Sequence, residues 1–171
     1  MEVEVKHLAK VFATMQGLET LILWQNNIKG EEMKILLESL KSCKNLRELD
    51  LSDNYLDDEA IPILIELLKC DNKIELLKIA DCNVSEEGTN LIKEFMEDCE
   101  RSLKVLTYNY NEIENIKEFA EALKNHKSLT RLEIKGICEE EDHKIVKDIL
   151  PNCEVIFESD YEDDGEAEDH V

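Results

Sequence analysis

The chain has little of what a membrane or secreted protein requires. Among its 171 residues, no apolar run approaches the roughly 18 residues that mark a membrane-spanning helix. The opening segment, MEVEVK at residues 1–6, lacks the basic and apolar regions of a secretory signal. We therefore expect a cytoplasmic protein that does not bind membranes.

Basic residues are scarce: 20 Lys and Arg stand against 41 Asp and Glu, which gives a net charge of −21. Such a chain repels nucleic acid phosphates and anionic lipids, so neither is expected as a partner. The charge favours basic protein surfaces and fast, salt-sensitive encounters with them. Solubility alone would also explain it, because excess acids keep many proteins monomeric. We expect a monomer.

The sequence also lacks catalytic and metal-binding motifs. Its six cysteines form no C-x-x-C pair, so buried, reduced thiols are expected instead of a zinc site. Its four histidines are scattered, and there is no P-loop and no dinucleotide fingerprint. The acids at 139–142 are contiguous, which favours a solvated helix start over an acid/base pair. We expect no cofactor, no metal and no enzymatic activity of its own.

A repeat is present instead. Residues 46–56 read LRELDLSDNYL, the pattern Leu-x-x-Leu-x-Leu-x-x-Asn-x-Leu of a leucine-rich repeat. Related copies begin at Leu18, Ile74, Leu103 and Leu129, so successive copies are separated by a nearly constant interval of about 28 residues. In this pattern the leucines fill a core and the asparagine turns inward to bond exposed backbone groups.

An apolar stripe at helical spacing follows each strand motif, as in Met33, Leu36, Leu37 and Leu40. A strand and a helix within each repeat of this length predict an α/β solenoid of the ribonuclease-inhibitor type. We expect about five repeats with a parallel concave sheet, over residues 1–157.

The two ends differ from the repeats. Residues 7–15 predict a helix with the stripe Leu8, Val11, Phe12 and Met15, whose strand is either missing or supplied by Val3 and Val5. A short strand at 154–157 should close the sheet. Residues 158–171 contain eight acids, no Lys or Arg and no period, which predicts a disordered acidic tail.

Function is expected on the concave surface, because alternate strand residues point there. The partner-binding candidates lie at these positions or just after the strand: Trp24, Gln25, Asp50, Asp53, Asp81, Asn109 and Tyr110. Trp24, the single tryptophan, is interpreted as a contact anchor. The alternative is that it packs flat on Ile22 and Asp50.

Four segments resemble, in this order and spacing, the C-terminal half of the Ran GTPase-activating proteins: QNNI at 25–28, DLSDN at 50–54, DCNVSEEG at 81–88 and YNEIE at 110–114. Ribonuclease inhibitor and the actin-capping tropomodulins share the repeat class without this combination and the acidic tail. The resemblance implies a protein that binds the small GTPase Ran and speeds GTP hydrolysis by positioning the GTPase's own residues.

The resemblance places the family's key asparagine in a repeat upstream of these residues, so Asn26, Asn54 and Asn111 are not given that role. We therefore expect weak or no activation, with Asp53 and Asp81 facing a basic patch of the partner. The alternative hypothesis is a leucine-rich-repeat adaptor or inhibitor that binds a protein without activating it.

Overall fold

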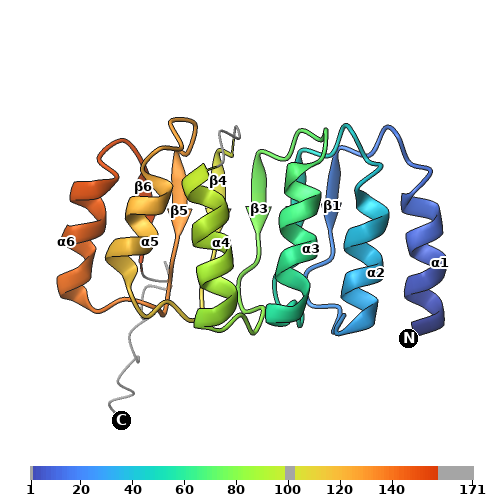
Figure 1. Cartoon of the computed structure of the whole chain (residues 1–171), viewed down its shortest axis with the longest axis horizontal. Coiled ribbons are helices and arrows are strands. Elements are labelled where there is room, and N and C mark those ends of the chain that lie inside the picture. Colours follow the sequence, from blue (N-terminus) through green and yellow to red (C-terminus); the bar gives the residue numbers. More distant parts are fainter. Residues whose placement is uncertain (1, 99–102, 158–171) are drawn as a thin grey trace, which may run out of the picture.

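The structure, a computed structural model, describes residues 2–98 and 103–157. The predicted tail at 158–171 lies outside the described residues. Helices and strands alternate along the chain (Figure 1). The elements are α1 Glu2–Phe12, β1 Thr20–Ile22, α2 Glu31–Leu40, β2 Glu48–Asp50, α3 Asp57–Lys69, β3 Leu76–Lys78, α4 Glu86–Asp98, β4 Val105–Thr107, α5 Ile116–Leu123, β5 Arg131–Glu133, α6 Glu140–Ile149 and β6 Glu154–Ile156.

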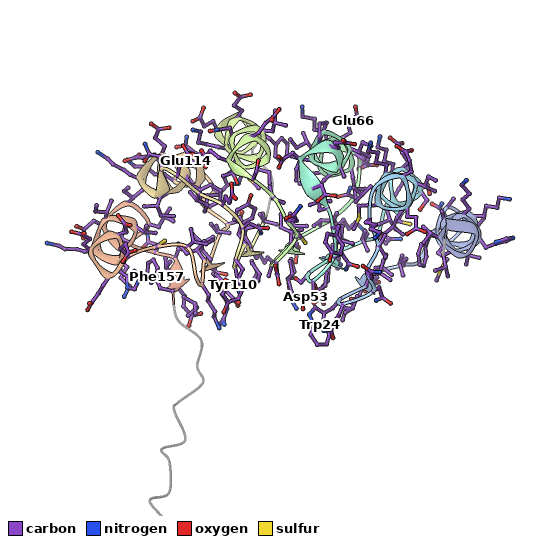
Figure 2. The ribbon with its side chains drawn as sticks, turned by 90° about the horizontal axis from the view of Figure 1, so that it is seen from below. Trp24, Asp53, Glu66, Tyr110, Glu114 and Phe157 are labelled. Atoms are coloured by element: carbon purple, nitrogen blue, oxygen red, sulfur yellow. The ribbon has the colours of Figure 1, made fainter. Side chains whose placement is uncertain are left out.

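The strands form one parallel sheet in the order β1-β2-β3-β4-β5-β6, and all the helices lie on one side of it (Figures 1 and 2). The sequence period sets the register, because Thr20 pairs with Glu48 and Glu48 with Leu76, which are equivalent positions of successive repeats. The predicted leucine-rich-repeat solenoid is confirmed, and so is its closing strand, β6. The expected helix start near 139–142 is also found, where the Glu139 N–H donates to the Asp142 carboxylate at the beginning of α6.

The core lies between the sheet and the helices. The middle residue of each strand points into it: Leu21, Leu49, Leu77, Leu106, Leu132 and Val155 are all buried. The stripe of α2 meets these residues from the other side, and Met33, Leu36, Leu37 and Leu40 are buried as predicted. Each repeat therefore covers the apolar face of the next one, which is how a solenoid builds a continuous core from short units.

Asn54 shows how the turns after the strands are held. Its side-chain Oδ1 accepts from the backbone N–H groups of Asn26 and Ile28, at 3.2 and 2.9 Å. Its Nδ2 donates to the carbonyls of Leu23, Leu51 and Ser52, at 2.8, 2.9 and 3.1 Å. The predicted inward role of the asparagine is confirmed.

Asn111 repeats this arrangement further along the solenoid, with Oδ1 accepting from the N–H groups of Cys82 and Val84. Cys82 stands at the asparagine position between them, and its thiol donates to the carbonyl of Leu51 at 3.3 Å. Burial raises the pKa of this thiol to about 12, so it stays protonated and able to donate.

The first helix differs from the prediction. It spans Glu2–Phe12 and not residues 7–15, so of the two alternatives left open for its strand, Val3 and Val5 do not supply one, because both lie in the helix. Val5 and Ala9 are buried, whereas Leu8, Val11 and Met15 are 47%, 53% and 39% exposed. The predicted stripe is therefore only partly buried. The physical reason is that α1 lies at one end of the row of helices and, among the described helices, packs against α2 alone (Figure 1).

A carboxylate connects the helix starts of two neighbouring repeats. Asp58, in the first turn of α3, accepts from the N–H groups of Ser85 and Gly88 at 2.9 and 3.2 Å and from the Ser85 hydroxyl at 2.5 Å. Acceptors at a helix N-terminus satisfy its free N–H groups. Gly88 permits this approach, because a Cβ there would clash with Asp58 Oδ1 and would lie only 2.7 Å from Val84 Cγ1.

We expect Gly88→Ala to destabilise the fold by about 1–3 kcal/mol, because the added methyl group must displace the capping carboxylate or the Val84 side chain. Urea unfolding measures this loss. Gly17→Ala is the matched control, since a Cβ there would meet nothing within 4 Å. If the two variants were equally stable, the close approach of Asp58 to Gly88 would not exclude a side chain at residue 88.

Candidate protein-binding face

The third residue after each of the first five strands adopts a left-handed backbone conformation. Gln25, Asp53, Asp81 and Tyr110 have φ of 57°, 55°, 47° and 59°, and Gly136 has φ of 68°. Each of the four non-glycine residues donates its backbone N–H to a carbonyl of the following repeat: Ser52, Ala80, Asn109 and Lys135, respectively. We call Gln25, Asp53, Asp81 and Tyr110 the turn row. Asp tolerates this conformation better than most residues do, which explains its presence at two of these positions.

A shallow hollow of about 360 Å³ lies along this row. Its lining is entirely polar apart from one aromatic ring: Gln25, Asn27, Asp53, Asn54, Tyr55, Asp81 and Asn83. Two carboxylates from successive repeats, Asp53 and Asp81, therefore share one hollow. Such a lining suits a donor-rich, cationic group of a partner better than an apolar ligand.

Trp24 stands beside this hollow and is 54% exposed. Its indole Nε1 donates to the carboxylate of Asp53. Figure 2 shows Trp24, Asp53 and Tyr110 on the strand side of the molecule, away from Glu66 and Glu114 on the helix side. The hydrogen bond fixes the polar edge of the ring while half of the side chain stays accessible, as in an aromatic contact residue.

Two of the predicted contact residues are not accessible. Asp50 and Asn109 are only 8% and 7% exposed. Asp50 Oδ1 accepts from the Ser52 N–H at 3.0 Å, and Asn109 Oδ1 accepts from the Lys135 N–H at 2.7 Å. The expectation that these side chains project towards a partner is wrong, because short polar side chains bend back to satisfy nearby backbone donors.

The charge on the strands is partly neutralised. Lys78 Nζ lies 3.2 Å from Glu48 Oε1. Arg131 Nε lies 2.8 Å from Glu133 Oε1, and Arg131 Nη1 lies 3.2 Å from Glu154 Oε2. The concave surface is therefore less acidic than its acid count suggests.

The turn row keeps its negative charge. Within residues 2–98 and 103–157, neither Asp53 nor Asp81 has a Lys or Arg within 4.0 Å. The negative potential of this face is consequently concentrated beside the hollow, at the ends of the strands.

Sequence reasoning missed Tyr55, which lines the hollow and is 47% exposed. Lys29 Nζ lies 5.8 Å from the centre of its ring. The repeat pattern could have indicated Tyr55 as a surface residue of the turn, because Asn27, Tyr55 and Asn83 directly follow the asparagine position in three successive repeats. Two of these three, Asn27 and Asn83, also have positive φ, which marks a second residue of the same turn.

The described part of the chain shows no sign of other chemistry. Within it, no three His, Cys, Asp or Glu residues are grouped so that they could hold a metal ion. None of its helices is long and apolar enough to cross a bilayer. Tyr108 is buried in the core, and burial raises the pKa of its phenol. Its hydroxyl is 2.6 Å from that of Thr89, so its role is structural.

Comparisons with known proteins agree with the fold. The family model "Leucine Rich Repeat" matches residues 45–68. No curated protein sequence matches the chain. Among solved structures, leiomodin-1 actin-binding site 2 is similar with a TM-score of 0.64 and 18% identity, over 87% of each chain.

A tropomodulin C-terminal domain from Caenorhabditis elegans has a TM-score of 0.49 and 9% identity, over 90% of this chain and 84% of that one. This second likeness is too weak to support an inference.

These findings correct one prediction. The resemblance to Ran GTPase-activating proteins implied a Ran-type GTPase as the partner, and none of these comparisons names such a protein. The structural neighbour that covers 87% of the chain is instead titled as an actin-binding site. The Ran-type partner is therefore wrong. Within the motifs at 50–54 and 110–114, Asn54 and Asn111 bond backbone groups of the turns, so these two residues serve the architecture of the repeat. The chain is a leucine-rich-repeat solenoid.

Proposed function

We propose that this solenoid is a non-activating protein-binding module, an adaptor or inhibitor, which docks a basic partner surface on the turn row. The observation on which this rests is the hollow shared by Asp53 and Asp81, with exposed aromatic side chains at its side. No chemical step is part of this function. The module acts by occupying or bridging the surface of its partner.

The contacts of the site support a cationic partner with some apolar character. Asp53 and Asp81 offer carboxylate oxygens to Lys or Arg side chains, and charge-assisted hydrogen bonds of this kind are stronger than neutral ones. Trp24, Tyr55 and Tyr110 are about half exposed and offer ring faces to guanidinium or aliphatic groups. Large aromatic residues around a charged centre are typical of the few residues that dominate binding energy.

The first partner to test is actin, because the neighbour with a TM-score of 0.64 is titled as an actin-binding site. At 18% identity that likeness shows a shared fold and not a shared interface. Actin is therefore the candidate to be measured first, and the turn row defines where contact is expected.

We expect Asp53→Lys and Asp81→Lys to slow association with a basic partner about tenfold each, since charge reversal at an interface rim acts on the encounter rate. The loss should shrink as salt rises, because the Debye length falls from about 10 Å at 0.1 M to about 3 Å at 1 M. Stopped-flow or surface binding with monomeric actin, and with a lysine-rich peptide as a second probe, measures these rates.

Glu114→Lys is the matched control, because it makes the same change of charge on the helix side (Figure 2). An equal effect of Glu114→Lys would mean that only the net charge matters, and it would remove the turn row as the docking site. Binding of the lysine-rich peptide without binding of actin would keep the site and exclude actin. No binding of either probe at low salt would refute the proposal.

A further inference from the structure

The turn row continues the spacing of the sheet. The backbone N–H of each of its members bonds to a carbonyl of the following repeat at 2.8–3.0 Å, so the hydrogen bonds between repeats do not stop where the strands end. Neighbouring hydrogen-bonded strands lie about 4.8 Å apart, so three such steps take the row about 14 Å from Gln25 to Tyr110. Figure 2 shows Trp24, Asp53 and Tyr110 following one another along this side of the molecule.

The hollow beside the turn row runs in the same direction. Apart from the buried Asn54, its lining residues form two rows. The turn row contributes Gln25, Asp53 and Asp81, and a second row, two residues further along the chain, contributes Asn27, Tyr55 and Asn83. Both rows take one residue from each of three successive repeats. A segment of a partner that lies along this hollow therefore crosses the strands and contacts one repeat after another.

Aromatic side chains flank the two carboxylates of the row, and both are held in place. The indole of Trp24 donates to Asp53. The ring of Tyr110 lies against the backbone of Gly136, where an added Cβ would clash with it. Trp24 and Tyr110 nevertheless remain 54% and 56% exposed. Because neither ring has to be ordered when a partner arrives, the entropic cost of binding is lowered.

We propose that the segment of the partner that docks on the turn row is a basic amphipathic α-helix lying across the strands; this inference rests on the proposed function of the row. A helix advances about 5.4 Å per turn, so three turns cover about 16 Å and nearly match the row. The difference of about 2 Å is within the reach of long Lys and Arg side chains.

An extended segment fits this spacing less well. Its side chains on one face are about 6.7 Å apart, so three intervals cover about 20 Å. That exceeds the length of the row by more than the distance between two neighbouring strands, about 4.8 Å. An extended segment would therefore lose its register with the repeats before it reached the end of the row, whereas a helix would keep it.

The chemistry of the row determines the pattern of the helix. Asp53 and Asp81 each require a cation, and the rings at either side require apolar side chains. The helix should therefore present an apolar residue, two cations and a second apolar residue on consecutive turns, at positions i, i+4, i+7 and i+11. Amphipathic helices that bind in grooves use anchors at this spacing, and here the two central anchors are charged.

Two peptides of identical composition and a third, non-helical one test the inference. The first carries Leu, Arg, Arg and Leu at positions i, i+4, i+7 and i+11 of an alanine-rich helix, and the second distributes the same four residues around the helix. The third keeps the first pattern but replaces two central alanines by prolines, which break the helix. Fluorescence of Trp24, the single tryptophan of the complex, measures binding. We expect the first peptide to bind about tenfold or more tightly than the others.

The outcomes separate this inference from the proposed function. Equal affinities for all three peptides would overturn the helix and leave docking of a basic surface on the turn row in place. No binding of any peptide at low salt would refute both.

Tyr110→Ala tests the register at the end of the row. It should weaken binding of the first peptide about tenfold and leave that of the second nearly unchanged, because only the patterned helix places an apolar residue on this ring. Tyr110→Phe is the matched control, which keeps the ring and should bind both peptides as the unchanged chain does. Equal losses for the two peptides in Tyr110→Ala would overturn the inference, since the ring would then act without regard to spacing.

Discussion

Asn54→Ala is expected to destabilise the protein by about 4 kcal/mol or more. The substitution removes a side chain that bonds two backbone N–H groups and three carbonyls around a buried turn. Alanine cannot replace any of these bonds, and a buried polar group left without a partner costs about 1–3 kcal/mol. The free energy of unfolding from urea denaturation, with fluorescence of Trp24 and circular dichroism as two probes, measures the loss.

Asn26→Ala is the matched control for this effect. Asn26 occupies the same position one repeat earlier and donates to the carbonyls of Leu23 and Trp24, but it is exposed. Water can satisfy these groups after the substitution, so the cost should be about 1 kcal/mol or less. Similar losses in the two variants would show that the asparagine acts through the local turn alone and not through the bonds that Asn54 makes between repeats.

Leu51→Ala is expected to cost about 2–5 kcal/mol. Leu51, which directly follows β2 in the repeat that best fits the pattern, is fully buried. Truncation loses the transfer free energy of its methyl groups and leaves a cavity, because the rigid backbone around it cannot collapse fully. Thermal and urea unfolding measure this loss, and the slope of the urea transition shows whether the protein still unfolds as one unit.

Ile22→Ala provides the comparison for Leu51→Ala, since Ile22 lies on a strand but is 58% exposed. The cost there should remain near that of a surface substitution, about 0.5 kcal/mol. If Leu51→Ala were equally mild, Leu51 would not fill the core between neighbouring repeats, and the register of the sheet would have to differ.

The solenoid could be predicted from the sequence alone. The regular recurrence of the strand motif fixed the register of the strands, and the spacing of Leu49, Leu51 and Asn54 fixed which side chains turn inward. This is possible because the repeat is a local pattern: its strand, turn and helix are all specified within one stretch, and neighbouring copies need only stack. The helix start at α6 and the closing strand β6 followed from equally local signals.

Which residues on the predicted face are accessible depends on the packing of neighbouring repeats and could not be predicted from the sequence. The repeat pattern placed Asp50 on the concave face and Asp53 just after the strand, but only the fold shows that Asp50 bends back onto a backbone N–H while Asp53 reaches the hollow. The physical reason is that accessibility depends on the side chains of two adjacent repeats, and these lie a whole repeat away in the sequence. The same reason explains α1, where Leu8 fits a core pattern but has no neighbouring repeat among the described residues to cover it.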